Sequence, residues 1–327
     1  MQEKQIPLAV IVGPTASGKT ALAVEMAKRL NGEVVSADSM QIYREMQIGT
    51  ARPTEEEMEG VPHHLLGHVA MTEGYSVAQY VQDARQVIAD IHRRGRLPIV
   101  AGGTGLYVSS LVNGIEFTEM PRNEALSARL EEKARTEGGE ALLRELAEFD
   151  PESAARLHPN NLGRIVRALE VYYTTGVTMT EQMRRSRAHA PDWRLGMLGI
   201  TCADRAVLYD RINRRVTQMM EMGLEAETRR VLAQPGGKTA LQAIGYKELA
   251  PYVRGECPLA EALENLRRAT RRYAKRQLTW FRRDERIHWL EADRFPERTA
   301  MYDAAEQQLR QALMLPGATE GGTAHEQ

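Results

Sequence analysis

The chain has 327 residues, of which 43% are hydrophobic and 27% are charged, as in a globular protein with one large domain or two smaller ones. Its formal net charge of -1 excludes a global attraction to nucleic acid, so contact with a polyanion must come from local clusters of Lys and Arg. No apolar run reaches the roughly 20 residues of a membrane span, and Cys202 and Cys257 lie far apart without CxxC spacing. We therefore expect a cytoplasmic protein without a membrane partner, a disulfide framework or a thiolate metal site.

The first third of the chain alternates between predicted strands and helices. Residues 6–12 form an apolar run that ends at glycine, and residues 17–30 follow with helical spacing. A second strand is predicted over residues 33–36, a long amphipathic helix over 76–95, and a buried strand over 97–101. This alternation predicts an α/β fold with a parallel, doubly wound sheet.

Strand-like runs disappear between about residues 121 and 192, where segments rich in Glu, Arg, Leu and Ala predict helices. The predicted helices of this region cover residues 123–136, 140–149, 151–157, 162–173 and 180–185. Strands and helices then alternate again over residues 195–201, 204–222, 259–280, 287–290 and 297–315. We therefore predict a discontinuous sheet core (1–120 and 193–315), an all-helical insertion (121–192) and a disordered tail (316–327).

A P-loop motif, GxxxxGK[ST], lies between the first predicted strand and helix, which is the context that the motif requires. Its glycines let backbone N–H groups converge on phosphate oxygens, and the helix N-terminus adds positive potential. Lys19 can neutralise a terminal phosphate, and the Thr20 hydroxyl can bind Mg²⁺. The predicted diphosphate or triphosphate site comprises Gly13, Pro14, Thr15, Ala16, Ser17, Gly18, Lys19 and Thr20.

The acidic residue that nucleotide hydrolases place after a second apolar strand is missing here, because residues 97–101 end in Gly102-Gly103-Thr104-Gly105. The nearest acid at a strand end is Asp38, which could bind a metal, accept a proton from a nucleophile or only cap its turn. The second glycine loop can pack against a ligand, and the Thr104 hydroxyl can face a phosphate oxygen, although such a threonine more often bonds its own backbone. A motor or GTPase function is therefore disfavoured.

The densest basic segment lies near the carboxyl end of the chain, with aromatic residues between its charges. On a helix it would present a broad positive face that either tracks a sugar-phosphate backbone or pairs with Glu261 and Glu264. Its members are Arg267, Arg268, Arg271, Arg272, Lys275, Arg276, Arg282, Arg283 and Arg286. A smaller cluster of Arg184, Arg185 and Arg187 ends the helical insertion. The adjacent His63 and His64 are expected to be structural, because no carboxylate or cysteine completes a metal set around them.

Taken in order, these motifs resemble those of the bacterial tRNA dimethylallyltransferases over nearly the whole chain. The matching segments are the P-loop, Asp38-Ser39-Met40-Gln41-Ile42-Tyr43-Arg44, Ile48-Gly49-Thr50-Ala51-Arg52-Pro53, Pro62-His63-His64-Leu65, Gly102-Gly103-Thr104-Gly105-Leu106-Tyr107, Asp150-Pro151, His158-Pro159-Asn160-Asn161, Arg167-Ala168-Leu169-Glu170, Gln242-Ala243-Ile244-Gly245-Tyr246-Lys247-Glu248 and Tyr273-Ala274-Lys275-Arg276-Gln277-Leu278-Thr279-Trp280-Phe281.

The resemblance implies transfer of a dimethylallyl group from dimethylallyl diphosphate to the N6 amine of the adenosine 3′ of the anticodon. It makes Asp38 the general base, with Lys19, Thr104 and either Arg215 or Arg211 at the diphosphate, and Mg²⁺ at Thr20. It also implies a flipped target base and a tRNA anticodon stem-loop held by the insertion and the basic helix. The implied tRNA-binding residues are Asp38, Ser39, Met40, Gln41, Thr104, Leu162, Gly163, Arg164, Ile165, Val166, Arg272, Lys275 and Arg276. The family also suggests a monomer.

Three other functions fit parts of the sequence. A small-molecule kinase would hold ATP on the same P-loop and use Asp38 as a base toward a hydroxyl group. A prenyltransferase acting on free AMP would share the core but would not need the helical insertion. A binding module for RNA would keep the basic segment without catalysis.

Overall fold

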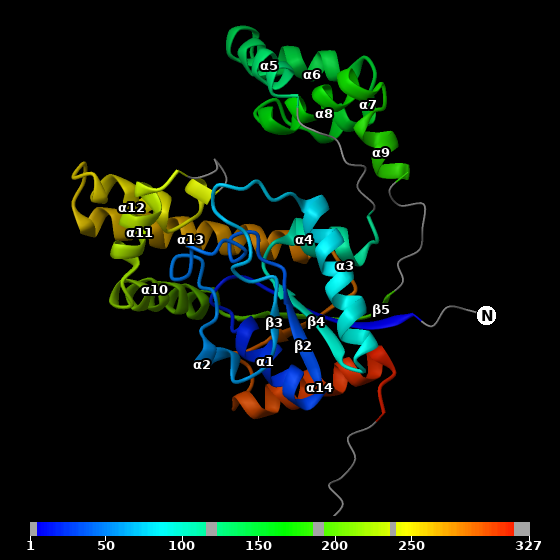
Figure 1. Cartoon of the computed structure of the whole chain (residues 1–327), viewed down its shortest axis with the longest axis vertical. Helices are drawn as coiled ribbons and strands as arrows, with labels where there is room; N and C mark the ends of the chain where they lie inside the picture. The colour runs from blue at the N-terminus through cyan, green and yellow to red at the C-terminus, as the bar shows by residue number, and fades with distance from the viewer. Residues whose placement is uncertain (1–4, 116–122, 186–192, 236–239, 317–327) are drawn as a thin grey trace, which may run out of the picture. The chain divides into compact units, whose positions relative to one another are not determined.

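The computed structural model describes residues 5–115, 123–185, 193–235 and 240–316 (Figure 1). The chain divides into two compact units, one formed by Met1–Val112 with Asp192–Gln327 and the other by Asn113–Pro191. The domain boundaries predicted at 121 and 192, and the predicted disordered tail beyond residue 316, lie outside the described residues.

A six-stranded sheet forms the centre of the first unit, in the order β3-β2-β4-β1-β5-β6, and every pair of neighbours is parallel. Its strands are β1 (Ile6–Val12), β2 (Gly32–Ser36), β3 (His63–His64), β4 (Leu97–Gly102), β5 (Trp193–Thr201) and β6 (Ile287–Glu291). Because β5 pairs with β1 across the whole helical unit in sequence, the core is discontinuous. The predicted α/β fold class is confirmed.

Helices cover both faces of the sheet, because β1 sends alternate apolar side chains to opposite sides. Leu8 and Val10 pack on one face with α3 (Val77–Arg93), α4 (Gly105–Val112) and the end of α13 (Leu259–Phe281). Ala9 and Ile11 pack on the other with α1 (Lys19–Arg29) and α14 (Arg298–Leu313). Burial on both faces explains why the predicted strands are continuous apolar runs.

Several short elements in this unit were absent from the sequence prediction. They are α2 (Glu55–Met58), β3, α11 (Leu224–Ala233), the 3₁₀ turn Ala240–Gln242 and α12 (Tyr246–Val253), whereas the predicted α10 (Arg205–Glu221) is present. Helix α12 follows Gly245 at a φ of 108° and contains Pro251, which are both signals that normally break a helix. Tertiary packing of Tyr246 and Leu249, both fully buried, overrides those signals.

The second unit is entirely helical in its described part, with α5 (Glu124–Glu137), α6 (Gly139–Ala147), α7 (Pro151–Arg156), α8 (Leu162–Thr175) and α9 (Met179–Arg185). Its own core includes Leu130, Leu142 and Leu169. Asn123 caps α5 by accepting a hydrogen bond from the Leu126 amide. The predicted helices are thus present, with ends shifted by a few residues. Among the described residues, no helix combines the length and apolarity that a membrane span requires.

Candidate active site

The P-loop begins where β1 ends and is shaped by two glycines with positive φ, 152° at Gly13 and 102° at Gly18. A Cβ on Gly13 would lie 2.2 Å from the Ile200 carbonyl oxygen of β5, so only glycine fits between the two strands. The Lys19 Nζ donates a hydrogen bond to the Pro14 carbonyl at 2.7 Å. The P-loop therefore folds back over the side chain of Lys19, the first residue of α1.

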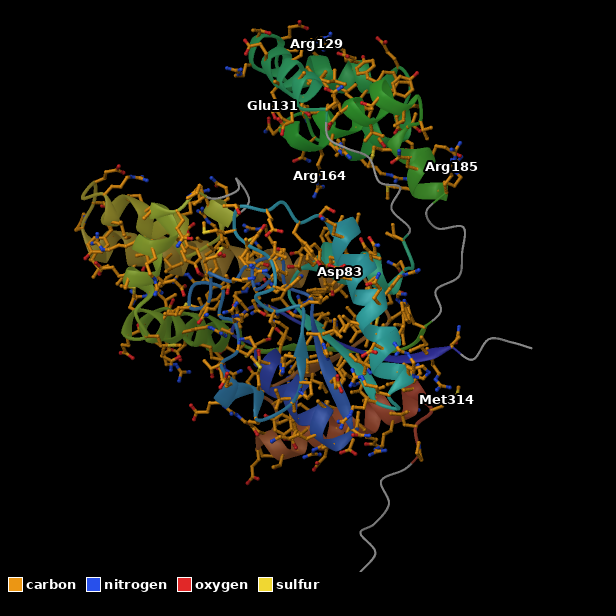
Figure 2. The ribbon with its side chains drawn as sticks, viewed as in Figure 1. Asp83, Arg129, Glu131, Arg164, Arg185 and Met314 are labelled. Carbon is orange, nitrogen blue, oxygen red and sulfur yellow. The ribbon has the colours of Figure 1, made fainter. Side chains whose placement is uncertain are left out.

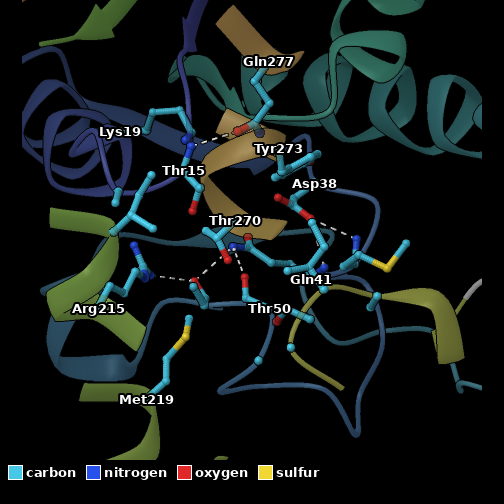
Figure 3. Close-up of a pocket in the computed structure, with 18 of the residues that line it drawn as sticks. Thr15, Lys19, Asp38, Gln41, Thr50, Arg215, Met219, Thr270, Tyr273 and Gln277 are labelled. Atoms are coloured by element: carbon cyan, nitrogen blue, oxygen red, sulfur yellow. Dashed lines mark hydrogen bonds between the residues drawn. The ribbon is translucent and has the colours of Figure 1, made fainter. Parts of the chain in front are cut away.

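Asp38 follows β2 and lies in the same cavity as Lys19 (Figure 3). Its Oδ1 accepts hydrogen bonds from the Met40 amide at 2.9 Å and the Gln41 amide at 3.4 Å, which leaves Oδ2 for a ligand. Burial raises the pKa of the Asp38 carboxyl, opposed by those amides and by the positive charge of Lys19. Burial also lowers the pKa of Lys19 to about 8; the Asp38 charge opposes this shift and the Arg215 charge adds to it.

The shared cavity has a volume of about 480 Å³. The predicted residues that line it are Thr15, Ala16, Gly18, Lys19, Thr20, Asp38, Ser39, Met40, Gln41, Arg215 and Arg276. Apolar side chains of α10, α13 and the segment before α12 also line it, namely Ile212, Val216, Met219, Ala243, Ile244 and Leu266. The arrangement suits a ligand with a phosphorylated end and a small hydrocarbon end.

Of the two arginines proposed for the diphosphate, Arg215 lines both the cavity and a neighbouring hollow, whereas Arg211 lines the hollow alone. Arg215 lines the cavity, and its Nη2 lies 3.4 Å from the Ala51 carbonyl oxygen. Arg211, one turn earlier on α10, lines a neighbouring hollow with Met58 and Met222, and its Nη1 lies 3.5 Å from the Ser17 carbonyl oxygen. The geometry therefore favours Arg215 as the residue that reaches a ligand in the cavity.

The segment 47–51 closes one side of the cavity and is held by a buried carboxylate that the sequence analysis missed. Glu227 of α11 accepts hydrogen bonds from the amides of residues 47, 48 and 49 at 2.9 to 3.1 Å, and from the Tyr246 hydroxyl at 2.7 Å. The carbonyls of Thr50 and Ala51 then accept from the Gln41 side-chain amide at 3.2 and 3.0 Å. The motif 48–53 marked this segment in the sequence, but the motif could not identify Glu227, which lies about 180 positions away.

The second glycine loop is packed against protein. Cβ atoms added at Gly102, Gly103 and Gly105 would lie 2.2 Å from the Ala37 carbonyl oxygen, 2.1 Å from Gln277 Nε2 and 2.4 Å from the Trp280 ring. The Thr104 hydroxyl accepts a hydrogen bond from the Ser39 amide at 2.9 Å. The structure thus places Thr104 beneath the turn that presents Asp38, and contact of Thr104 with a diphosphate stays a prediction.

Two residues of α13, Tyr273 and Gln277, line the cavity and had no predicted role, although both belong to a quoted motif. Burial and the charge of Asp38 raise the pKa of the Tyr273 hydroxyl. The guanidinium of Arg276 lies 5.6 Å from the centre of the Tyr273 ring. On the same helix Arg272 and Lys275 are exposed, whereas Arg271 is bonded to Asn213 and Glu264. The basic segment is therefore divided between exposed charges and charges that are already paired.

The other predicted RNA contacts lie in the helical unit. Leu162, Gly163 and Arg164 are exposed at the start of α8, and Arg164 and Arg185 extend away from their helices (Figure 2). Ile165 and Val166 are buried in the core of that unit, so their side chains support α8. Arg184 and Arg185 both bind Glu181, and Arg187 lies outside the described residues.

The histidines beside β2 contact protein groups. His64 Nε2 lies 2.8 Å from Glu33 Oε2, and His63 Nδ1 lies 2.8 Å from the Val61 carbonyl oxygen. Arg94 also binds Glu33, and these partners lower the pKa of the Glu33 carboxyl to about 2. The pair belongs to a structural ion network at the edge of the sheet.

Comparison with known proteins finds a match to the family described as IPP transferase over residues 41–284. The tRNA dimethylallyltransferase of Acetivibrio thermocellus is 49% identical over 288 residues, which are 88% of this chain and 92% of that protein. That of an Exiguobacterium species is 50% identical over 292 residues, 89% of this chain and 92% of that protein.

Solved structures agree. The tRNA isopentenylpyrophosphate transferase of Bacillus halodurans is 43% identical with a TM-score of 0.69, covering 94% of this chain and 98% of that one. A eukaryotic dimethylallyltransferase acting on tRNA is 28% identical with a TM-score of 0.76, and the match covers 96% of this chain and 81% of that one.

Proposed function

The chain belongs to the IPP transferase family, and from this premise we propose that it transfers a dimethylallyl group from dimethylallyl diphosphate to the N6 amine of the adenosine 3′ of the anticodon in tRNA. The observation that carries the proposal is the cavity that Lys19 and Asp38 share. It joins P-loop residues that can hold a phosphate, a carboxylate and apolar side chains within about 480 Å³. These are the three groups that a prenyl transfer to an amine requires.

In the proposed reaction, the N6 nitrogen forms a bond to C1 of the dimethylallyl group while the bond from C1 to the diphosphate oxygen breaks. The N6 proton passes to the Asp38 carboxylate, whose raised pKa makes it a better base than an exposed aspartate. The diphosphate leaves with the bonding electrons. Lys19, the P-loop amides and Arg215 stabilise the charge that develops on it.

Mg²⁺ is the proposed cofactor, and the residues present fit a magnesium ion held largely by the substrate. Thr20 and Asp38 line the cavity, and no cluster of three His, Cys, Asp or Glu side chains that could hold a metal occurs among the described residues. A cation that binds through one or two protein ligands, phosphate oxygens and water suits this donor set. The Thr20 hydroxyl would hold it, and its charge would weaken the bond to the leaving diphosphate.

The proposed partner is the tRNA anticodon stem-loop, with the target base flipped toward Ser39, Met40 and Gln41. The exposed Arg272, Lys275 and Arg164 support phosphate contacts by α13 and by the helical unit. From the resemblance to the family we propose a monomer, and because tRNA is the proposed substrate, a cytoplasmic location.

The experiment offers radiolabelled dimethylallyl diphosphate with Mg²⁺ to unmodified tRNA and to AMP in parallel, with and without ATP. We expect label in tRNA alone, release of diphosphate and no need for ATP. Label in AMP would favour the transferase that acts on free nucleotides, and ATP consumption without labelled tRNA would favour the kinase. In Asp38→Asn, which keeps the shape of the side chain, we expect turnover to fall about 10²- to 10⁴-fold while tRNA still binds; unchanged turnover would exclude Asp38 as the base.

A further inference from the structure

One peptide unit of the P-loop is held from both of its ends. The Pro14 carbonyl and the Thr15 amide belong to the same planar peptide group. Lys19 Nζ donates to the carbonyl at 2.7 Å, and the Oε1 of Gln277 accepts from the amide at 2.9 Å. Rotation of this plane would break both bonds, so the orientation of the plane and the resting place of the Lys19 ammonium depend on Gln277.

The other half of the Gln277 side chain reaches the second glycine loop. Its Nε2 donates to the Gly103 carbonyl at 2.9 Å, in a fully buried bond. The Gln277 side chain can come this close only because residue 103 is glycine. A Cβ at that position would lie 2.1 Å from Gln277 Nε2. One buried amide therefore joins the loop after β1, the loop after β4 and helix α13, and Figure 3 shows Gln277 beside Thr15.

We propose that Gln277 is a positioning residue for the diphosphate of the donor. It presets the first half of the P-loop from α13, so that Lys19 and the amides that follow Thr15 face the cavity before the ligand arrives. The inference rests on the proposed function only in taking the ligand of the P-loop to be a diphosphate. Because α13 also carries Tyr273 and Arg276 on the cavity, the same helix then aligns the donor site with the acceptor site.

The test replaces Gln277 with leucine, which has a similar volume and no hydrogen-bonding groups, and measures binding of inorganic pyrophosphate with Mg²⁺ by calorimetric titration without RNA. We expect about tenfold weaker binding, because the Thr15 amide and the Gly103 carbonyl lose their buried partner. In steady-state assays kcat/KM for dimethylallyl diphosphate should fall by at least a similar factor, while the KM for tRNA stays within about twofold.

Two further variants separate positioning from general loosening of α13. Gly103→Ala displaces the Gln277 amide from the opposite side and should weaken pyrophosphate binding in the same way. Trp280→Phe removes the bond from Trp280 Nε1 to Ser109 Oγ, 2.9 Å long, between the same helix and α4, and should leave pyrophosphate binding unchanged. Circular dichroism confirms that each variant is folded.

The outcomes distinguish this inference from the proposed function. If Gln277→Leu binds pyrophosphate as tightly as Trp280→Phe does, Gln277 is not a positioning residue, whatever the reaction is. If the wild-type protein binds pyrophosphate but leaves tRNA unmodified, the proposed function is wrong. The pyrophosphate titrations of the variants still test the role of Gln277 at the P-loop.

Discussion

The glycine loops that follow β1 and β4 have the same position in the fold but different surroundings. Each follows a parallel strand, β1 or β4, and each opens a helix, α1 or α4. In the first loop, Lys19 and Thr20 line the cavity. A Cβ on Gly13 would meet the Ile200 carbonyl oxygen at 2.2 Å, but a Cβ on Gly18 would come no closer than 3.6 Å to the Ile200 side chain. In the second, a Cβ added at Gly102, Gly103 or Gly105 would lie within 2.4 Å of other protein atoms.

The contrast teaches that glycines after a strand mark a close approach without saying what approaches. In the first loop Gly13 makes room for β5, while Gly18 and Lys19, whose pKa is lowered, line the cavity where we propose that the diphosphate binds. In the second loop the glycines let Ala37, Gln277 and Trp280 pack against the backbone, so that the loop fixes the segment that carries Asp38. Under the proposed function the first loop is the ligand site, and the second supports the segment that carries Asp38.

The largest effect should come from the lysine of the first loop. Lys19→Met removes the charge that faces the diphosphate, and we expect kcat/KM for the donor to fall by about 10²- to 10³-fold, as for other groups that stabilise developing charge. Lys28→Met, which removes an exposed charge from the same helix, is the control and should behave as the wild type. A loss of less than tenfold in the Lys19 variant would mean that the first loop is not the main diphosphate grip.

Alanine substitutions in the two loops should differ in their effects on the free energy of unfolding and on the affinity for pyrophosphate. In Gly102→Ala the new Cβ meets backbone atoms of Ala37, so we expect a loss of about 3 kcal/mol in the free energy of unfolding. In Gly18→Ala the space is open but φ is 102°, so the loss should be about 1 kcal/mol, with a weaker affinity for pyrophosphate. Urea unfolding and calorimetric titration measure both quantities. Equal stability losses would remove the distinction between the supporting loop and the ligand site.

The pH profile tests the electrostatics of the cavity. With rising pH, Lys19 loses its charge near its pKa of about 8, so kcat/KM for the donor should fall up to about tenfold per pH unit above that value. With falling pH, protonation of Asp38 should reduce activity at a pH above the usual range of an aspartate. Arg215→Met removes a positive charge that lowers both pKa values, so both limbs should move to higher pH. An unmoved alkaline limb would show that Lys19 does not set it.

The sequence predicted the parts of the site that are local in the chain. Strand, glycine loop and helix follow one another within residues 6–30, and Asp38 directly follows a predicted strand, so spacing alone places both at the same edge of a parallel sheet. The discontinuous core was also predictable, because strand-like runs stop and resume around the helical segment.

The rest of the site depends on partners distant in sequence. Gln277 meets the Thr15 amide across 262 positions, and Glu227 meets the Gly49 amide across 178. Arg211 and Arg215 are separated by one helical turn, and only the rotation of α10 against the sheet places Arg215 in the cavity. Neither periodicity nor motif spacing encodes that rotation.

Substitutions of Thr104 can show whether the second glycine loop contacts the diphosphate or supports the turn that carries Asp38, because the two roles predict different kinetics. As a diphosphate contact, its loss would raise the KM for the donor. As the support that accepts the Ser39 amide at 2.9 Å, its loss would loosen the turn of Asp38 and lower kcat. The packed surroundings of the loop favour the second assignment, so Thr104→Val should lower kcat about tenfold with an unchanged donor KM, and Thr104→Ser, which keeps the acceptor oxygen, should stay within about threefold of the wild type. A rise confined to the donor KM in Thr104→Val would instead make the second loop a ligand site like the first.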